Sequence, residues 1–125
     1  MKEIFYLEDD PINAYVLEKQ IGKKASVSVF THPDEALNAL KHGEKVFDLF
    51  LVDIHLGEGV MDGIAFCEKL REIPRYEHAT CIAVTAFAMP GDKEKLLTVG
   101  FDKYISKPII RTELISILSA ESIPF

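Results

Sequence analysis

The chain has 125 residues, of which 48% are hydrophobic, and it carries a formal net charge of −6 at pH 7. This length fits one domain spanning 1–125, and the apolar content is sufficient for a core without disulfides or a structural metal. The acidic balance argues against nucleic-acid binding, which needs a basic face.

Charged residues interrupt every apolar run, so no segment has the length of a signal peptide or of a membrane span. We therefore expect a cytoplasmic protein without membrane contact. The two cysteines, Cys67 and Cys81, lie in segments with periodic apolar residues. This position is typical of core residues in a reducing compartment and disfavours a disulfide.

The first half of the chain alternates short apolar runs with amphipathic segments. The apolar runs are typical of strands covered on both faces. Asp10 is a favourable N-cap and Pro11 occupies the preferred first helical position, while Gly22 and Gly43 are natural helix ends. We predict, in chain order, strand 4–7, helix 11–22, strand 27–30 and helix 33–43.

The second half continues this alternation. Pro90 and Gly100 bound the weakest of its helices. We predict a strand over 47–52 that ends at Asp53, a helix around 64–71, strand 81–85, helix 90–99, a strand containing 104–105, and a last helix with Leu114, Ile117 and Leu118 facing inward. Five strand–helix units in strict alternation imply an α/β fold with one doubly wound parallel sheet and helices on both of its faces.

In sheets of this class, ligands bind in the crevice beyond the carboxyl ends of the strands. Segments that are distant in sequence therefore deliver polar side chains to one edge. The residues that follow or end the predicted strands are Glu8, Asp9, Asp53, Thr85 and Lys107.

These residue types suit phosphoryl transfer. Clustered carboxylates repel one another unless a cation binds among them, and oxygen ligands of this kind suit Mg²⁺. Asp53 can act as a carboxylate nucleophile. Lys107 and the metal can neutralise the transferring oxygens, to which the Thr85 hydroxyl can donate a hydrogen bond.

The chain resembles a response-regulator receiver domain of two-component signalling, similar to the chemotaxis regulators, over essentially its whole length. The stretches that carry the resemblance are LEDDPIN at 7–13, LFLVD at 49–53, MDG at 61–63, VTAFAM at 84–89 and YISKP at 104–108. The resemblance implies a flavodoxin-like receiver fold with five helices and strand order 2-1-3-4-5.

The same resemblance implies a role for each residue of the motifs. Asp53 is the phosphoacceptor and binds Mg²⁺ together with Asp9, Glu8 assists through water, and His55 contributes its backbone carbonyl. Thr85 and Lys107 hold the phosphoryl group, Tyr104 swings inward on activation, and the Lys107–Pro108 bond is cis.

Two features depart from the family pattern. The loop 53–63 is about two residues longer than the commonest form and has Gly57 where proline is usual, and the first acidic residue is Glu8 in place of aspartate. His55 and Phe87 lie two residues beyond Asp53 and Thr85, where side chains can overhang the phosphoryl group. We predict that they tune its removal by water.

The resemblance implies a signalling module. We expect it to accept phosphate from a histidine kinase or a phosphotransfer protein and to signal to a downstream protein through its fourth helix, fifth strand and fifth helix. We expect no output domain, a monomer or a weak phosphorylation-dependent dimer, and no enzymatic activity other than Mg²⁺-dependent self-phosphorylation and autodephosphorylation.

Three alternatives stand beside this prediction. A pseudo-receiver would use the same fold for protein contact without phosphorylation. An aspartyl-phosphate phosphatase typically has a second aspartate two residues after the nucleophile, where this chain has His55. A flavodoxin needs a hydroxyl-rich phosphate loop, and the acidic residues 8–10 would repel a flavin phosphate.

Overall fold

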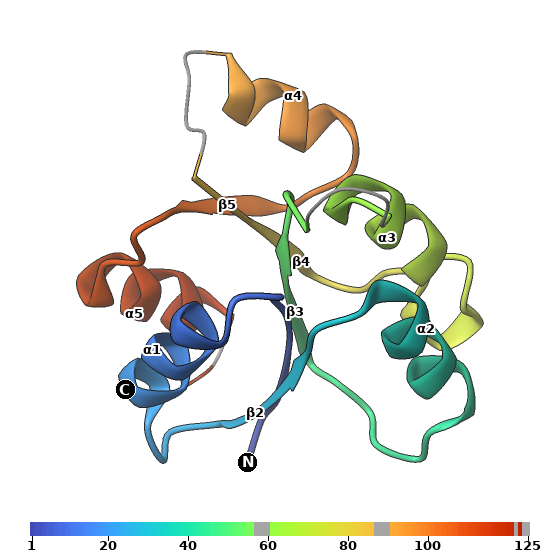
Figure 1. Cartoon of the computed structure of the whole chain (residues 1–125), viewed down its shortest axis with the longest axis horizontal. Coiled ribbons are helices and arrows are strands. Elements are labelled where there is room, and N and C mark those ends of the chain that lie inside the picture. Colours follow the sequence, from blue (N-terminus) through green and yellow to red (C-terminus); the bar gives the residue numbers. More distant parts are fainter. Residues whose placement is uncertain (57–60, 87–90, 122, 124–125) are drawn as a thin grey trace.

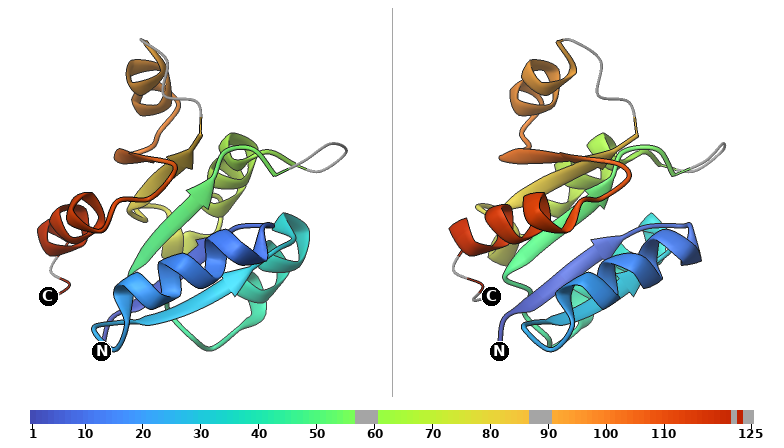
Figure 2. Two further views of the ribbon diagram at one scale, coloured as in Figure 1. Left: turned by 60° about the vertical axis from the view of Figure 1, so that its left-hand side comes forward. Right: turned by 90° about the vertical axis from the view of Figure 1, so that its left-hand side faces the viewer.

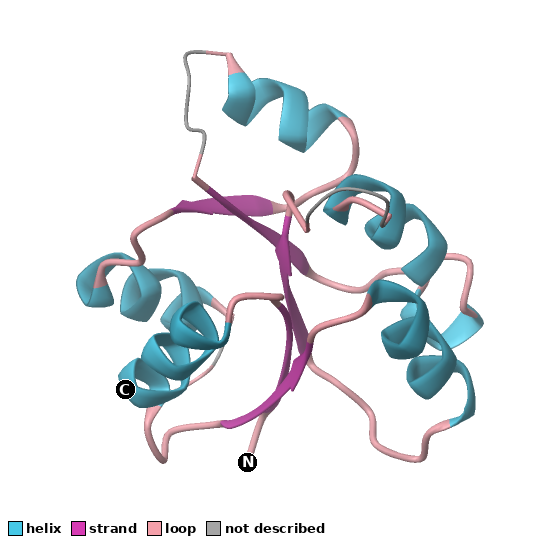
Figure 3. Ribbon diagram, in the orientation of Figure 1, coloured by secondary structure: helices cyan, strands magenta, loops and turns pink. Residues whose placement is uncertain are grey.

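A computed structural model describes residues 1–56, 61–86, 91–121 and 123. Five strands form one central sheet (Figure 3). They are β1 (Glu3–Leu7), β2 (Ser26–Phe30), β3 (Leu49–Asp53), β4 (Cys81–Thr85) and β5 (Lys103–Ser106). The order is β2-β1-β3-β4-β5 and every neighbouring pair is parallel, which confirms the predicted topology.

Five helices accompany the sheet in the described part of the chain: α1 (Pro11–Ile21), α2 (Pro33–His42), α3 (Gly63–Leu70), α4 (Asp92–Thr98) and α5 (Arg111–Ala120). Helices α1 and α5 lie on one side of the sheet and α2 and α3 on the other, with α4 near β4 and β5 (Figure 1). The turned views place α4 at the end of the molecule opposite β2 (Figure 2). Pro90, where the sequence predicts the start of the fourth helix, lies outside the described residues.

The pleat of β1 explains why no charged residue occurs between Ile4 and Leu7. Ile4 and Tyr6 pack in the core beneath α1 and α5, whereas Phe5 and Leu7 pack in the core beneath α2 and α3. All four side chains are fully buried. Because successive strand residues point to opposite faces, a strand covered on both sides has no position for a charged side chain until it ends. After Glu3, the next charged residues therefore come at Glu8 and Asp9.

Local signals set the beginnings of two helices beside the strand ends. The Asp10 side chain accepts the N–H groups of Ile12 and Asn13, so it caps α1 as predicted. Asp62 caps α3 in the same way by accepting the N–H of Ala65 at 2.8 Å.

The predicted start of the third strand at Phe47 is wrong by two residues. The Phe47 N–H donates to the Tyr76 hydroxyl at 3.3 Å, and the Asp48 side chain accepts the Glu3 N–H at 2.7 Å. Pairing with β1 begins at Leu49, opposite Ile4. Phe47 is nevertheless buried, so the apolar pattern is the same for the strand and for its approach. The sequence also did not predict the short 3₁₀ helix Pro74–Tyr76.

Cys67 on α3 and Cys81 on β4 are free and buried in the same core, in agreement with their interpretation as core residues. Among the residues that the structure describes, no helix combines the length and apolar character that crossing a membrane requires.

Candidate functional site

The carboxyl ends of β1, β3, β4 and β5 lie at one edge of the sheet and bring the predicted residues together. Backbone hydrogen bonds continue the sheet past its ends: the Glu8 N–H donates to the Phe30 carbonyl at 2.9 Å, and the Lys107 N–H donates to the Thr85 carbonyl at 2.8 Å. These bonds fix the backbone at Glu8 and Lys107. The side chains therefore start from defined positions.

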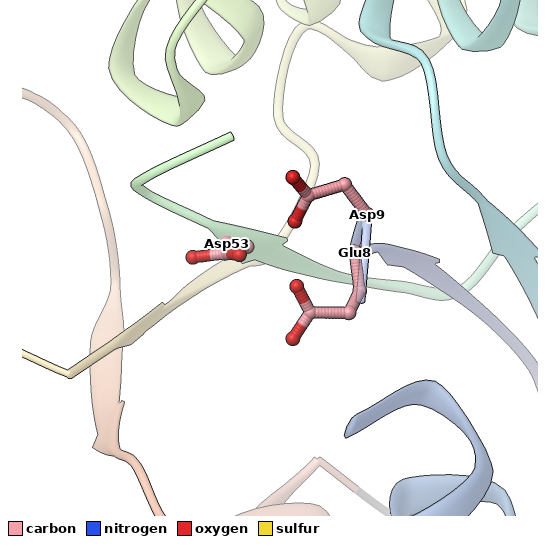
Figure 4. A group of neighbouring side chains, drawn as sticks. All are labelled: Glu8, Asp9 and Asp53. Carbon is pink, nitrogen blue, oxygen red and sulfur yellow. The ribbon is translucent and has the colours of Figure 1, made fainter. Parts of the chain in front are cut away.

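Three carboxylates converge at this edge. Glu8, Asp9 and Asp53 each offer one oxygen, and these oxygens lie within 4.8 Å of one another. Glu8 and Asp9 extend from the end of β1 toward Asp53 at the end of β3 (Figure 4). Glu8 and Asp53 are buried, with 0% and 3% of their surface exposed, whereas Asp9 is exposed. The cluster thus has a buried floor and one side open to solvent.

Lys107 links two of these carboxylates. Its Nζ lies 2.7 Å from Glu8 Oε1 and 3.1 Å from Asp53 Oδ2. Burial lowers the pKa of Lys107, but its contacts with Glu8 and Asp53 outweigh that effect and raise the pKa above its ordinary value. The lysine is therefore a cation at neutral pH. The Lys107–Pro108 peptide bond is cis, as predicted.

Glu8 has excess negative charge around it despite the lysine. Burial raises the pKa of Glu8, and the proximity of Asp53 raises it further, although Lys107 opposes both. Its Oε2 is buried and has no hydrogen-bond partner among the residues that the structure describes. A buried oxygen without a donor, on a carboxylate that is clustered with two others, suits a hard divalent cation such as Mg²⁺. The residues therefore fit the metal that the resemblance implies.

Asp53 is held by both of its oxygens. Oδ1 accepts the N–H of His55 at 3.1 Å, and Oδ2 accepts from Lys107. The start of α3 packs tightly against the adjacent backbone. The Gly63 N–H donates to the Ile54 carbonyl at 3.1 Å, and a Cβ at Gly63 would lie 2.9 Å from Ile54 Cα. This close approach explains the glycine of the MDG stretch. The longer loop at Gly57 lies outside the described residues.

A cavity of about 360 Å³ opens beside Thr85. His55 and Lys95 also line it, together with apolar side chains that include Ile54 and Leu96. Thr85 itself is buried, and His55 is exposed. Phe87, the second residue expected to overhang the phosphoryl group, lies outside the described residues.

Tyr104 lines a different hollow from the one beside Thr85. It is half-buried on β5 and packs against the core beneath α2 and α3. It also lines a groove of about 380 Å³ between α4, β5 and α5, with Leu97 and Ile117 among the other lining residues. The fourth helix, fifth strand and fifth helix thus share a hollowed face, at the position predicted for contact with a downstream protein.

Sequence reasoning missed one residue at this edge. The Tyr6 hydroxyl donates to Glu8 Oε1 at 3.0 Å from within the core. Burial raises the pKa of this hydroxyl, as do the neighbouring carboxylates, of which Glu8 contributes most. The available signal was a hydroxyl in an otherwise apolar strand, two residues before Glu8 and therefore on the same face of β1.

The family model for the response regulator receiver domain matches residues 4–119. The chain belongs to this family. A receiver domain of a sensor histidine kinase from Pseudomonas aeruginosa, PA1611, solved with a magnesium ion coordinated in its active-site cleft, superposes with a TM-score of 0.81. The two share 30% sequence identity over 95% of each chain.

Among curated proteins, the polar-differentiation response regulator DivK of Brucella abortus is 34% identical over 109 residues, which cover 86% of this receiver domain and 85% of DivK. The histidine-protein kinase BarA of Escherichia coli is 46% identical over 72 residues, or 58% of this chain. That match spans 8% of BarA's length. This receiver domain is therefore similar both to most of the length of a response regulator and to a short part of a histidine-protein kinase.

Proposed function

We propose that this receiver domain accepts a phosphoryl group on Asp53 from a histidine kinase or a phosphotransfer protein and transmits that event through protein contact. One observation carries the proposal: Asp53 is a buried carboxylate with Lys107 on one oxygen and two further carboxylates within 4.8 Å. Membership of the two-component receiver family supports it.

In the proposed reaction, one oxygen of Asp53 attacks the phosphorus of a phosphohistidine. The P–N bond breaks, an O–P bond forms, and the released imidazole takes up a proton. Lys107 offers its positive charge to the transferring oxygens from its position against Oδ2. When bound by Glu8, Asp9, Asp53 and the His55 carbonyl, Mg²⁺ would supply further neutralisation of charge on those oxygens.

The added phosphoryl group brings nearly two negative charges and new acceptor oxygens to the site. We expect the Thr85 hydroxyl to donate to one of them, since Thr85 lines the cavity beside Asp53's strand. Movement of Thr85 would be transmitted to β5, because Thr85 pairs with Ser106, two residues beyond Tyr104 on the same strand. The groove between α4, β5 and α5 is the proposed contact surface for a downstream protein.

A second surface is suited to the phosphodonor. Three large apolar side chains of α1 are exposed, and they begin directly after the acidic residues: Ile12 (73% exposed), Tyr15 (61%) and Val16 (41%). A helix bearing the donor histidine could bury these side chains while its imidazole reaches Asp53. This apolar face supports a protein donor, because an exposed apolar patch beside a reactive site indicates a protein interface.

The test is intact-mass measurement after incubation with Mg²⁺ and a small phosphodonor. Wild type should gain one phosphoryl group and Asp53→Asn none, because an amide oxygen is a poor nucleophile and no other described carboxylate lies against Lys107 except Glu8. Asp34→Asn, an exposed change on α2, is the matched control and should be phosphorylated like wild type. Omission of Mg²⁺ should suppress the gain.

The outcome separates the alternatives. If wild type and Asp53→Asn both stay unmodified, the protein is a pseudo-receiver that acts by contact alone. Continuous release of inorganic phosphate with many turnovers per Asp53 would favour the phosphatase.

A further inference from the structure

Tyr6 is the only polar side chain within β1 between Glu3 and Glu8. Its ring is fully buried in the core beneath α1 and α5, and its hydroxyl reaches Glu8 Oε1 at 3.0 Å. A phenylalanine would fill this apolar space without needing a hydrogen-bond partner. The hydroxyl therefore has a cost in the core that its bond to Glu8 offsets.

The bond divides the two oxygens of Glu8 between different neighbours. Oε1 accepts from Tyr6 at 3.0 Å and from Lys107 at 2.7 Å. Oε2 is buried and accepts no hydrogen bond from any described residue. Because both donors lie on Oε1, the carboxylate is held in one orientation, and Oε2 is left for a ligand that is not a hydrogen-bond donor of the protein.

We propose that Tyr6 is a positioning residue for the cation site, whose hydroxyl orients Glu8 so that Oε2 is available to a cation bound together with Asp9 and Asp53. The inference rests on the proposed Mg²⁺-dependent function and adds a residue to it. Lys107 alone cannot fix this orientation, since it also binds Asp53 Oδ2 and moves with whatever binds there. Tyr6, enclosed by the core, provides a donor that stays in place.

The hydrogen bond between Tyr6 and Glu8 depends on the length of the glutamate side chain. Glu8 has one more methylene than aspartate, and its Oε1 reaches the Tyr6 hydroxyl with that length. An aspartate at this position would withdraw from the hydroxyl. Tyr6 should therefore matter for metal binding only while residue 8 is glutamate.

Tyr76 offers a matched control within the same protein. It is also buried, with 2% of its surface exposed, and its hydroxyl accepts the Phe47 N–H at 3.3 Å. It lies in the core on the opposite side of the sheet, beneath α2 and α3. Tyr76→Phe thus removes a buried, hydrogen-bonded hydroxyl without touching Glu8.

The experiment is calorimetric titration of the full chain with Mg²⁺ alone, without phosphodonor, on variants whose folding is checked by thermal melting. Tyr6→Phe should raise the Kd for Mg²⁺ by about tenfold, the usual effect of removing a group that orients a metal ligand. Tyr76→Phe should leave the Kd unchanged. A purely structural role for Tyr6 predicts that both variants lose stability and that neither changes the Kd.

A double-mutant cycle sharpens the test. In a Glu8→Asp background, the further change Tyr6→Phe should leave the Kd for Mg²⁺ unaltered, because the hydrogen bond is already lost. An equal loss of affinity in both backgrounds would overturn the proposed pairing. So would an unchanged Kd in Tyr6→Phe alone, or a wild type that does not bind Mg²⁺.

Tyrosine emission provides an independent signal, since the chain has four tyrosines and no tryptophan. A cation at Glu8 draws charge from the carboxylate that accepts the Tyr6 hydroxyl, so Mg²⁺ should change the emission of wild type and of Tyr76→Phe but not of Tyr6→Phe. Neither readout uses phosphorylation. Failure of Asp53 to accept phosphate and failure of Tyr6 to affect metal binding are therefore distinguishable.

Discussion

The two ends of the sheet each have a cation that joins distant segments, but the charges around it differ. At the carboxyl end, Lys107 contacts Glu8 and Asp53 beside a third carboxylate, Asp9. At the amino end of β4, Arg71 donates to the Gly100 and Ala79 carbonyls and to the Asp102 carboxylate. Asp102 also accepts the backbone N–H of Cys81 at 2.8 Å.

This difference in charge balance indicates that the amino end contributes to stability and that the carboxyl end is suited to ligand binding. Arg71 faces one carboxylate and two carbonyls, so its charge is balanced and most of its donors are used, Nε excepted. Lys107 faces a cluster with three carboxylates, one of which keeps a buried oxygen without a donor. A site with unbalanced buried charge is costly unless a ligand compensates it. The carboxyl end is therefore suited to bind a further cation, whereas Asp102 already balances the charge of Arg71 at the amino end.

The largest effect should follow from removing the cation at the carboxyl end. Lys107→Met should slow phosphorylation of Asp53 by about 100-fold, because one charged donor to the transferring oxygens is lost. The rate of mass gain with a small phosphodonor measures this.

Lys103→Met on the neighbouring β5 is the control for loss of a lysine. Lys103 pairs with Glu121 at 3.1 Å on the surface and should not affect the rate. A Lys107→Met rate equal to that of wild type would contradict the assigned role of Lys107 and remove the contrast between the two ends.

Much of the carboxyl end could be predicted from the sequence, for a topological reason. The ends of parallel strands meet at one edge, so residues that follow apolar runs come together whatever their separation along the chain. Glu8, Asp53 and Lys107 follow this rule, and their mutual distances agree with it.

The partners of side chains inside the core could not be predicted in the same way. The Tyr6–Glu8 bond depends on rotamers, and the Arg71–Asp102 pair joins residues 31 positions apart through packing of α3 against the turn before β5. The start of β3 was mispredicted because Phe47 is buried both as a strand residue and as the approach to one. Periodicity reports burial, and burial alone does not specify a hydrogen-bond partner.

Removal of the Arg71 side chain at the amino end should reduce the stability of the fold without affecting metal binding at the carboxyl end. Arg71→Met removes bonds to the Gly100 and Ala79 carbonyls and leaves these acceptors without a charged donor. We expect the free energy of unfolding to fall by about 2 kcal/mol, measured by urea denaturation. The affinity for Mg²⁺ should stay as in wild type.

The exposed Lys69 on α3 supplies the comparison, and Lys69→Met should leave the free energy of unfolding as in wild type. If Arg71→Met instead weakened Mg²⁺ binding while stability held, the two ends would be coupled, and the division of roles between them would be wrong.

The smallest effect concerns two exposed histidines, one at each end. His55 lines the cavity beside Thr85, whereas His78 lines a smaller one with Arg71. His55→Ala should accelerate loss of the phosphoryl group from Asp53 by about threefold. The imidazole ring of His55 would no longer shield the phosphoryl group, so water would reach it more easily. His78→Ala should keep the wild-type rate. Intact-mass measurement after removal of the phosphodonor follows the decay.

Identical rates for His55→Ala and wild type would show that this side chain does not control the access of water. A slower decay in His55→Ala would mean that the imidazole assists the attacking water.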